Sequence, residues 1–259
     1  MNKKFGLIGY PLSHSFSEKY FIEKFERENI PDCKYNLYPI EKIEQLSQLL
    51  ADNPELCGLN VTIPYKESII PFLDELDENA KAVGAVNCIK IVKDTETKAS
   101  RLIGFNTDIF GFKQSIKPFL ETQHHRALIL GAGGGAKAVS FVLKEIGIDC
   151  FFVTRSKRAG NVEDQQIENL FSYEELNENI VNAFKLIINA SPVGMYPNIN
   201  EAPALPYRFI SHSHLLYDLI YNPNETEFLK RGKSKGASVV NGLSMLHQQA
   251  EEAWRIWNK

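Results

Sequence analysis

The sequence predicts an α/β protein of two domains, with a C-terminal helix that returns to the first domain. Short β-branched or aromatic runs alternate with amphipathic helical stretches in two successive series along the 259 residues. This alternation is typical of strands joined by helices in a mainly parallel sheet. We place the first domain at residues 1–107, completed by 241–259, and the second at 108–240. At about 150 residues per domain, the length fits this division.

The first series begins near the N-terminus. Strands are expected at 4–10, 33–40 and 56–64, and helices at 15–29 and 40–52. The first helix carries apolar residues at spacings of three to four, which predicts one buried face: Phe16, Tyr20, Phe21 and Phe25. Ser13 precedes it as a suitable N-cap.

The second series opens with a helix from Ile109 to about Leu120, for which Asp108 is the expected N-cap. Strands follow at 127–130, 149–154, 185–191, 215–221 and 237–242. A last helix from Ser244 to Trp257 closes the chain.

The composition excludes several functional classes. With 29 Lys and Arg against 32 Asp and Glu, the net charge is −3, so no overall positive field attracts nucleic acid or an anionic membrane. The apolar runs are far shorter than the ~20 residues of a membrane span, and the N-terminus resembles no signal peptide. We expect a cytoplasmic protein that acts on a small molecule, as a monomer or a homodimer.

The cysteines predict neither a disulfide framework nor a metal site. Cys33, Cys57, Cys88 and Cys150 are widely spaced and form no CxxC pair. We therefore expect four reduced thiols, most of them buried.

A glycine-rich turn predicts a dinucleotide site. Gly131, Gly133 and Ala136 form a GxGxxA pattern between an apolar strand and an amphipathic helix, as in Rossmann-type domains. The glycines allow close approach of a pyrophosphate, whose charge meets the free amides of the helix N-terminus. A tight strand-to-helix turn without a ligand is the alternative.

The end of the next strand favours NADP over NAD. NAD sites place Asp or Glu there, whereas this chain has the run Thr154, Arg155, Ser156, Lys157 and Arg158. A guanidinium matches an adenosine 2′-phosphate in charge and geometry. An ordinary solvated loop is the other interpretation.

Five further clusters lie at expected strand ends or helix starts: GYPLSHS at 9–15, NVTIPYK at 60–66, GAVN at 84–87, GFNTD at 104–108 and GLSMLHQQ at 242–249. With the glycine-rich turn, the basic strand end and NASPVGM at 189–195, the pattern resembles the shikimate dehydrogenase family from residue 5 to the final helix. The resemblance implies an N-terminal substrate domain and a Rossmann-type NADP domain. It also implies reversible NADPH-dependent reduction of 3-dehydroshikimate to shikimate, in chorismate and aromatic amino acid biosynthesis.

Lys66 and Asp108 are the candidates for proton transfer. Hydride transfer to a ketone needs a separate group that exchanges a proton with the oxygen, and a Lys ammonium beside a carboxylate suits that task. The resemblance assigns the catalytic pair to these two residues. From the residues alone, Lys66 is an exposed loop lysine and Asp108 a helix cap. His14 is interpreted as structural or orienting.

The resemblance also implies the substrate contacts. Ser13 and Ser15, helped by Tyr221, hold the carboxylate, and neutral side chains hold the ring hydroxyls: Thr62, Asn87 and Gln249. Gln248 is the alternative to Gln249. Turn formation and strand-end hydrogen bonding are the structural alternatives for these polar residues.

The cofactor residues that the resemblance implies lie mainly in the glycine-rich turn, the basic strand end and the loops around the nicotinamide: Gly131, Ala132, Gly133, Gly134, Gly135, Thr154, Arg155, Ser156, Arg158, Asn189, Ser191, Leu219, Gly242, Met245 and Glu78. Met195 and Met245 form an apolar shelf for the nicotinamide, or simply pack in the core. The family usually carries Asn-Arg-Thr where this chain has Thr154-Arg155-Ser156, which leaves the adenine contact of Thr154 open.

Two alternative functions remain at this point. One is a quinate/shikimate dehydrogenase with broader substrate and cofactor use, against which Arg155 and the Ser13, Ser15 and Thr62 set argue. The other is a catalytically inactive NADP-binding regulatory module, against which the intact Lys66 and Asp108 argue.

Overall fold

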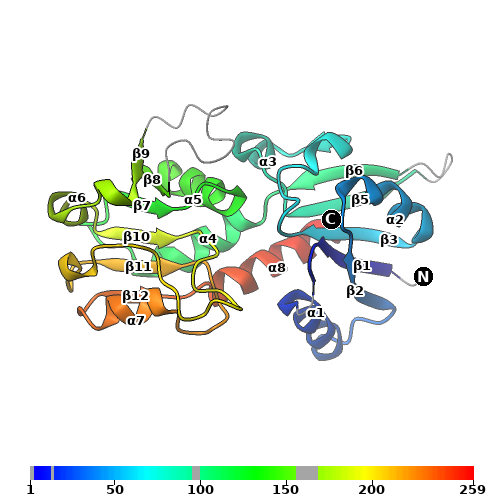
Figure 1. Cartoon of the computed structure of the whole chain (residues 1–259). Helices are drawn as coiled ribbons and strands as arrows, with labels where there is room; N and C mark the ends of the chain where they lie inside the picture. The colour runs from blue at the N-terminus through cyan, green and yellow to red at the C-terminus, as the bar shows by residue number, and fades with distance from the viewer. Residues whose placement is uncertain (1–2, 13–14, 95–99, 156–168) are drawn as a thin grey trace. The chain divides into compact units, whose positions relative to one another are not determined.

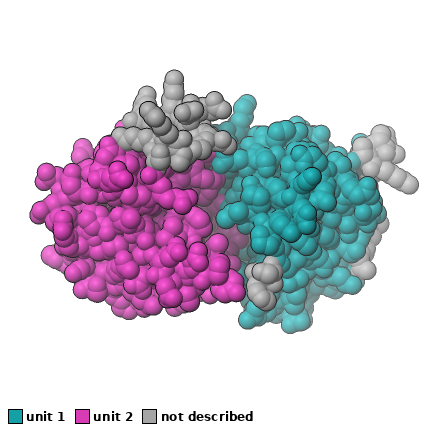
Figure 2. Space-filling model, in the orientation of Figure 1, with its two compact units in different colours: residues 1–107, 250–259 teal, residues 108–249 magenta. Residues whose placement is uncertain are grey.

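The computed structural model describes residues 3–12, 15–94, 100–155 and 169–259. The chain forms two compact units (Figure 2): unit 1 comprises Met1–Thr107 and Ala250–Lys259, and unit 2 comprises Asp108–Gln249. None of the helices in the described part of the chain is long and apolar enough to cross a membrane. Cys33 and Cys57 are half-buried free thiols, and Cys88 and Cys150 are buried ones.

Unit 1 is built on a mixed sheet of strand order β2-β1-β3-β5-β6-β4 (Figure 1). Its strands are β1 (Lys3–Gly9), β2 (Cys33–Pro39), β3 (Leu56–Val61), β4 (Glu75–Leu76), β5 (Cys88–Lys93) and β6 (Ser100–Phe105). Its helices are α1 (Phe16–Arg27), α2 (Leu46–Asp52), α3 (Glu78–Val83) and the end of α8 (Leu243–Trp257), with 3₁₀ turns at Ile43–Gln45 and Ile70–Phe72.

The expected mainly parallel sheet is only partly correct for this unit. β1 pairs in parallel with β2 and β3, but β5 pairs antiparallel with β3 and β6. The short connection between β5 and β6 accounts for the second of these pairings, because it leaves no room for the dozen or more residues that a parallel crossover requires.

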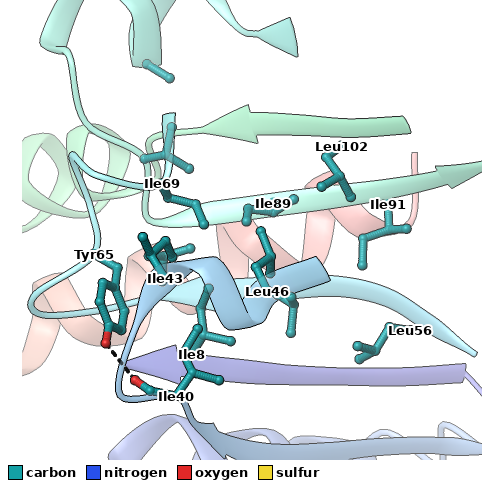
Figure 3. Packing of buried hydrophobic residues seen from close by; sticks show 14 residues of the cluster. Ile8, Ile40, Ile43, Leu46, Leu56, Tyr65, Ile69, Ile89, Ile91 and Leu102 are labelled. Carbon is teal, nitrogen blue, oxygen red and sulfur yellow. Dashed lines mark hydrogen bonds between the residues drawn. The ribbon is translucent and has the colours of Figure 1, made fainter. Parts of the chain in front are cut away.

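Alternating side chains of β1 divide the core of unit 1 between two faces. Ile8 packs with residues of α2 and α3 on one face, and Figure 3 shows Ile8, Leu46, Ile69 and Ile89 gathered there. The Tyr65 hydroxyl closes this cluster by donating to the Ile40 carbonyl at 2.6 Å. The sheet is therefore buried on this side by the helices after β2 and β4.

The opposite face of the sheet is covered by α1 and the end of α8. Phe5 stacks on Trp257 with ring centroids 4.8 Å apart, and the Trp257 Nε1 donates to the Ile89 carbonyl at 3.0 Å. A Cβ at Gly58 would clash with the indole, so glycine is required where this ring crosses β3. Buried Lys24 of α1 pairs with Glu251 of α8 at 2.8 Å.

Unit 2 is built on a parallel sheet of strand order β12-β11-β10-β7-β8-β9. Its strands are β7 (Arg126–Leu130), β8 (Asp149–Thr154), β9 (Leu170–Ser172), β10 (Leu186–Asn189), β11 (Leu215–Asp218) and β12 (Ser238–Val240). Its helices are α4 (Asp108–Ile116), α5 (Gly134–Glu145), α6 (Glu178–Ala183), α7 (Glu227–Lys233) and the start of α8, with 3₁₀ turns at Lys117–Phe119, Tyr173–Glu175 and Tyr207–Phe209.

Helices cover both faces of this sheet as well. Val181 of α6 and Phe228 of α7 pack with Leu216 in one core cluster. On the other face, Phe112 of α4 meets Tyr217 edge to face at 5.2 Å. The buried Ser115 and Tyr217 hydroxyls are 2.6 Å apart. Leu216 and Tyr217 thus alternate between the two faces, as strand geometry requires.

The second division between the two compact units falls inside α8, at residue 249/250. A Cβ at Gly111 of α4 would lie 2.6 Å from the Met245 carbonyl, so the first turns of α8 pack closely on unit 2. Ala250, Ala253 and Trp257 instead belong to the core of unit 1. A single helix is therefore shared by two cores.

Two expected helix caps are wrong by one or two residues. The N-cap of α1 is Ser15, whose hydroxyl accepts from the Ser17 amide at 3.2 Å, and Ser13 lies outside the described residues. α4 begins at Asp108 itself, so the cap position falls on Thr107, which is buried and bonded to the Asn87 side chain.

Candidate active site

The glycine-rich turn lies at the carboxyl end of β7, in the context that the sequence predicts. Gly131 has φ +112°, and a Cβ there would lie 3.0 Å from the Ala190 carbonyl oxygen and 3.3 Å from the Ser191 amide nitrogen. Gly133 caps α5, and a Cβ on it would meet nothing within 4 Å. Ala132, Gly134 and Gly135 complete the turn. Its backbone is thus open on the side of Gly133 and closed by the next loop on the side of Gly131.

The loop after β10 is shaped by Asn189, whose side chain is fully buried. Its Oδ1 accepts from the Ser191 amide at 3.1 Å and from the Ser191 hydroxyl at 2.6 Å. Its Nδ2 donates to the Val193 carbonyl at 3.2 Å. The side chain of Asn189 therefore fixes the path of residues 189–193 beside the glycine-rich turn.

The loops after β11 and β12 join the same edge of the sheet. The Leu219 amide donates to the Asn189 carbonyl at 2.9 Å, and the Gly242 amide donates to the Ile220 carbonyl at 3.0 Å. A Cβ at Gly242 would clash with the Leu219 carbonyl oxygen, so glycine is needed for this approach. Because carboxyl ends of parallel strands share one edge, the expected cofactor residues of unit 2 gather here.

Sequence reasoning missed Asp218, the last residue of β11, which is fully buried. Burial raises the pKa of its carboxyl from 3.8 to about 6, against the lowering effect of hydrogen bonds from Thr226, Ile220 and Asn189. The ionised carboxylate therefore lowers the free energy of unfolding at neutral pH by about 3 kcal/mol. The signal was a lone carboxylate inside the apolar run LLYDLIY.

The basic strand end follows β8. Thr154 pairs with Ser172 of β9, and Arg155 is exposed. Burial raises the pKa of Tyr173 to about 12, and the positive charge of Arg155 opposes this rise. Ser156, Lys157 and Arg158 lie outside the described residues.

Asp108 and Gln249 lie on two helices of unit 2 that pack against each other, α4 and α8. Both are buried, with 5% and 8% exposure. A Cβ at Gly111, one helical turn after Asp108, would lie 3.1 Å from the Gln249 Cβ. The Gln249 Nε2 donates to the Leu246 carbonyl at 3.0 Å, whereas Gln248 is half-buried. Gln249 is thus the glutamine that faces α4.

Tyr221 and Met245 complete the predicted residues of unit 2. Tyr221 is half-buried, and burial raises the pKa of its hydroxyl. Met245 is buried at 7% exposure, while Met195 is 40% exposed. The two methionines therefore differ, and of the pair only Met245 is a core residue.

In unit 1 the predicted substrate residues gather where β1, β3 and β6 end and β5 begins. The Thr62 amide donates to the Ile8 carbonyl at 3.0 Å, and the Val86 amide donates to the Lys66 carbonyl at 2.7 Å. Thr62 and Lys66 are half-buried. Ser15, at the start of α1, follows the loop after β1. His14 lies outside the described residues.

Asn87 is the most buried of these residues, with 3% exposure. Its backbone carbonyl accepts from the Val61 amide at 2.9 Å, and its side chain bonds to Thr107. Asn106, which sequence reasoning also missed, is buried and donates to the Ala85 carbonyl at 2.9 Å. Glu78 is an exposed residue in the first turn of α3.

Comparison with known proteins identifies relatives along nearly the whole chain. The family described as "Shikimate dehydrogenase substrate binding domain" matches residues 7–89. A curated NADP(+) shikimate dehydrogenase of Carboxydothermus hydrogenoformans is 39% identical over 263 aligned positions, which cover 97% of this chain and 90% of the relative.

Solved structures agree with this result. The crystal structure of shikimate dehydrogenase from Aquifex aeolicus has a TM-score of 0.84 and 32% identity, covering 99% of this chain and 92% of that one. The enzyme from Thermus thermophilus, solved in complex with NADP(H) and shikimate, has a TM-score of 0.82 and 30% identity, covering 98% and 93%. In fold and sequence alike, the chain belongs to the NADP-dependent shikimate dehydrogenases, a family of oxidoreductases.

Proposed function

We propose that this protein catalyses the reversible NADPH-dependent reduction of 3-dehydroshikimate to shikimate, a step toward chorismate and the aromatic amino acids. The observation that carries the proposal is the edge of unit 2, where Gly131 packs on the Ala190–Ser191 backbone and Gly242 on Leu219. This edge lies in a chain 39% identical to a curated NADP(+) shikimate dehydrogenase.

The residues of this edge suit a dinucleotide. The open backbone at Gly133 and the N-terminus of the twelve-residue helix α5 suit a pyrophosphate. Arg155, helped by Arg158, holds the adenosine 2′-phosphate. Asn189, Ser191, Leu219, Gly242 and Met245 surround the nicotinamide. When bound, NADPH supplies the hydride for the ketone carbon.

Lys66 and Asp108 manage the proton. In the reductive direction the Lys66 ammonium donates a hydrogen bond to the ketone oxygen, stabilises its developing negative charge and transfers its proton to it. Asp108 accepts a hydrogen bond from the ammonium and orients it toward the ketone oxygen. In the oxidative direction the neutral Lys66 amine takes the proton back from the alcohol. Each direction is thus balanced by one proton and one hydride.

The substrate is held by neutral groups. Ser13 and Ser15, with Tyr221, donate hydroxyl hydrogens to the carboxylate near the start of α1, where the helix dipole favours an anion. Thr62, Asn87 and Gln249 bond the ring hydroxyls. We assign substrate binding to residues 1–107 with 241–259, and NADP binding to 108–240.

One assay tests the proposal. The absorbance of reduced nicotinamide is followed with shikimate and with quinate, each with NADP⁺ and with NAD⁺, for the wild type and Lys66→Met. We expect shikimate with NADP⁺ to give the highest kcat/KM. Lys66→Met should lower kcat by at least ~100-fold with little change in KM.

The same assay separates the alternative functions. Comparable kcat/KM values for quinate and shikimate would identify the broader dehydrogenase. NADP⁺ binding without turnover of either ring acid would identify a regulatory module. Full activity of Lys66→Met would refute the proposed proton transfer.

A further inference from the structure

Asp218 joins three separate segments of unit 2 through its buried carboxylate. Its Oδ1 accepts from the Asn189 Nδ2 at 3.1 Å and from the Ile220 amide at 3.0 Å. Its Oδ2 accepts from the Thr226 hydroxyl at 2.6 Å. These donors are the last residue of β10, the loop after β11 and the N-cap of α7.

The segments held by Asp218 form the side of the site assigned to the nicotinamide. Asn189 in turn positions Ser191, because its Oδ1 accepts hydrogen bonds from the Ser191 amide and hydroxyl. Thr226 lies behind the same loop, since a Cβ at Gly194 would be 3.7 Å from the Thr226 Cβ. The Thr226 hydroxyl also accepts from the Leu229 amide at 3.4 Å. Asp218 therefore acts on residues 189–194 from two sides.

We infer that Asp218 is a positioning residue for NADP, which holds the loop 189–194 and the Leu219–Ile220 backbone in the geometry that receives the nicotinamide. It acts through Asn189 and Thr226 and touches no reacting atom. The inference rests on the proposed assignment of these loops to the cofactor.

The chemistry of the network requires an ionised acid. All three partners donate, and an ionised carboxylate only accepts, so each donor is satisfied. An asparagine amide or a protonated carboxyl at this position places a hydrogen opposite one of the three donors, which then has no acceptor. The titratable groups that interact electrostatically with Asp218, Tyr207 and Tyr217, both have a raised pKa through burial and stay neutral near pH 6. A charge kept in the core at the expense of stability is typical of a functional role.

The experiment compares Asp218→Asn with two variants of Thr226. Thr226→Val removes the hydroxyl and keeps the shape, while Thr226→Ser keeps the hydroxyl. Asn177→Ala is the matched control for a lost helix cap, since Asn177 caps α6 of the same unit by accepting from the Ile180 amide at 3.2 Å. The dissociation constants of NADP⁺ and of 2′-phospho-ADP-ribose, which lacks the nicotinamide, are measured by calorimetry, with the melting temperature of each variant.

We expect Asp218→Asn and Thr226→Val to weaken NADP⁺ binding roughly tenfold, the effect of one unsatisfied buried partner. The affinity of Asp218→Asn and Thr226→Val for 2′-phospho-ADP-ribose should change less than about twofold. The affinity of Thr226→Ser and Asn177→Ala for NADP⁺ should also change less than about twofold. The ratio of the NADP⁺ affinity of the wild type to that of Asp218→Asn should fall as the pH drops through about 6, where Asp218 becomes protonated. The titration of the ligand phosphate affects both proteins equally and cancels in this ratio.

The possible outcomes test the positioning role of Asp218 separately from the proposed function. Folded Asp218→Asn and Thr226→Val with wild-type affinity for NADP⁺ would overturn the inference and leave the proposed function standing. Equal weakening of both ligands would also overturn it, because a general loss of structure affects both. If Asp218→Asn yields no soluble protein, the two Thr226 variants decide by the same criterion. Folded wild-type protein that does not bind NADP⁺ would overturn the proposed function and, with it, the inference.

Discussion

The Asn87 carboxamide forms hydrogen bonds with Thr107 through both its oxygen and its nitrogen. The Asn87 Oδ1 accepts from the Thr107 amide at 2.6 Å, and the Asn87 Nδ2 donates to the Thr107 hydroxyl at 3.0 Å. Both residues are buried, and Thr107 directly precedes Asp108. The pair therefore fixes the backbone from which the proposed catalytic carboxylate projects.

Removal of the Thr107 hydroxyl should impair turnover. Thr107→Val leaves the Asn87 amide with one partner fewer, so we expect a loss of about 1 kcal/mol in unfolding free energy and a fall in kcat of roughly tenfold. Thr107→Ser keeps the hydroxyl and serves as the control, with kcat within about twofold of the wild type. Steady-state kinetics and urea denaturation measure both effects, and an unchanged kcat in Thr107→Val would contradict the positioning role.

Replacement of Asp108 should separate catalysis from helix stability. Asp108→Asn removes a charge from the first turn of α4 and should lower kcat by about 100-fold, with a stability loss of about 0.5 kcal/mol from the helix dipole. Glu178→Gln removes the corresponding charge from the first turn of α6. That control should show the same small stability loss with unchanged kcat. Similar kcat values for the two variants would exclude Asp108 from catalysis.

Cofactor choice should depend on Arg155. Arg155→Asp should raise the KM for NADP⁺ by at least about tenfold, because a charge-assisted hydrogen bond to the 2′-phosphate is lost, and should change the KM for NAD⁺ far less. Arg126→Asp makes the same charge change at the start of β7, at the opposite edge of the same sheet. It should leave both KM values near those of the wild type. Parallel changes for the two cofactors would refute the assignment.

Two buried histidines of unit 2 should each contribute a loss of stability in mild acid. Burial lowers the pKa of His124 and of His214 below the ordinary 6.5. Below about pH 6.5 each histidine therefore binds more protons in the unfolded chain than in the folded one, so its contribution to the free energy of unfolding falls as the pH drops. The raised pKa of Asp218 acts in the opposite direction, so the histidine contribution is measured as a difference between variants.

His124→Asn tests this dependence. The His124 Nδ1 accepts from the Glu121 amide at 2.9 Å, and an asparagine Oδ1 replaces that acceptor without a titrating ring. Urea denaturation at neutral pH and at about pH 5.5 should show a smaller loss of stability in His124→Asn than in the wild type. An identical loss in the wild type and in His124→Asn would be the contrary result.

The two-unit α/β architecture was predictable because strand and helix periodicities are properties of short segments. β5 and β6 were not predicted as strands, so their antiparallel pairing with each other and with β3 was missed as well. The end of unit 2 inside α8 was also not predictable, because a continuous amphipathic helix gives no sign of where its partner core changes. That change depends on close contacts such as Gly111 with Met245 and Gly58 with Trp257.

The sequence likewise predicted some parts of the candidate site and not others. The glycine-rich turn and the loop at Asn189 were found because their composition is unusual at strand ends. Asp218 was missed because nothing local distinguishes a buried polar residue with distant partners from an ordinary one. Asn106 and Thr107 belong to the GFNTD cluster, but nothing in the sequence indicated the bonds that each would make. Their partners lie up to 29 residues away in the sequence, and only the folded chain brings them together.

The sharing of α8 also determines the order in which the two cores become complete during synthesis. All of unit 2, residues 108–249, precedes the segment 250–259 that closes the core of unit 1 around Phe5 and Trp257. As the ribosome releases the chain from its N-terminus, the later unit is therefore the first to have its whole sequence available. Unit 1 begins first, but its apolar face beside Phe5 is covered only by α1 until the final residues of α8 emerge.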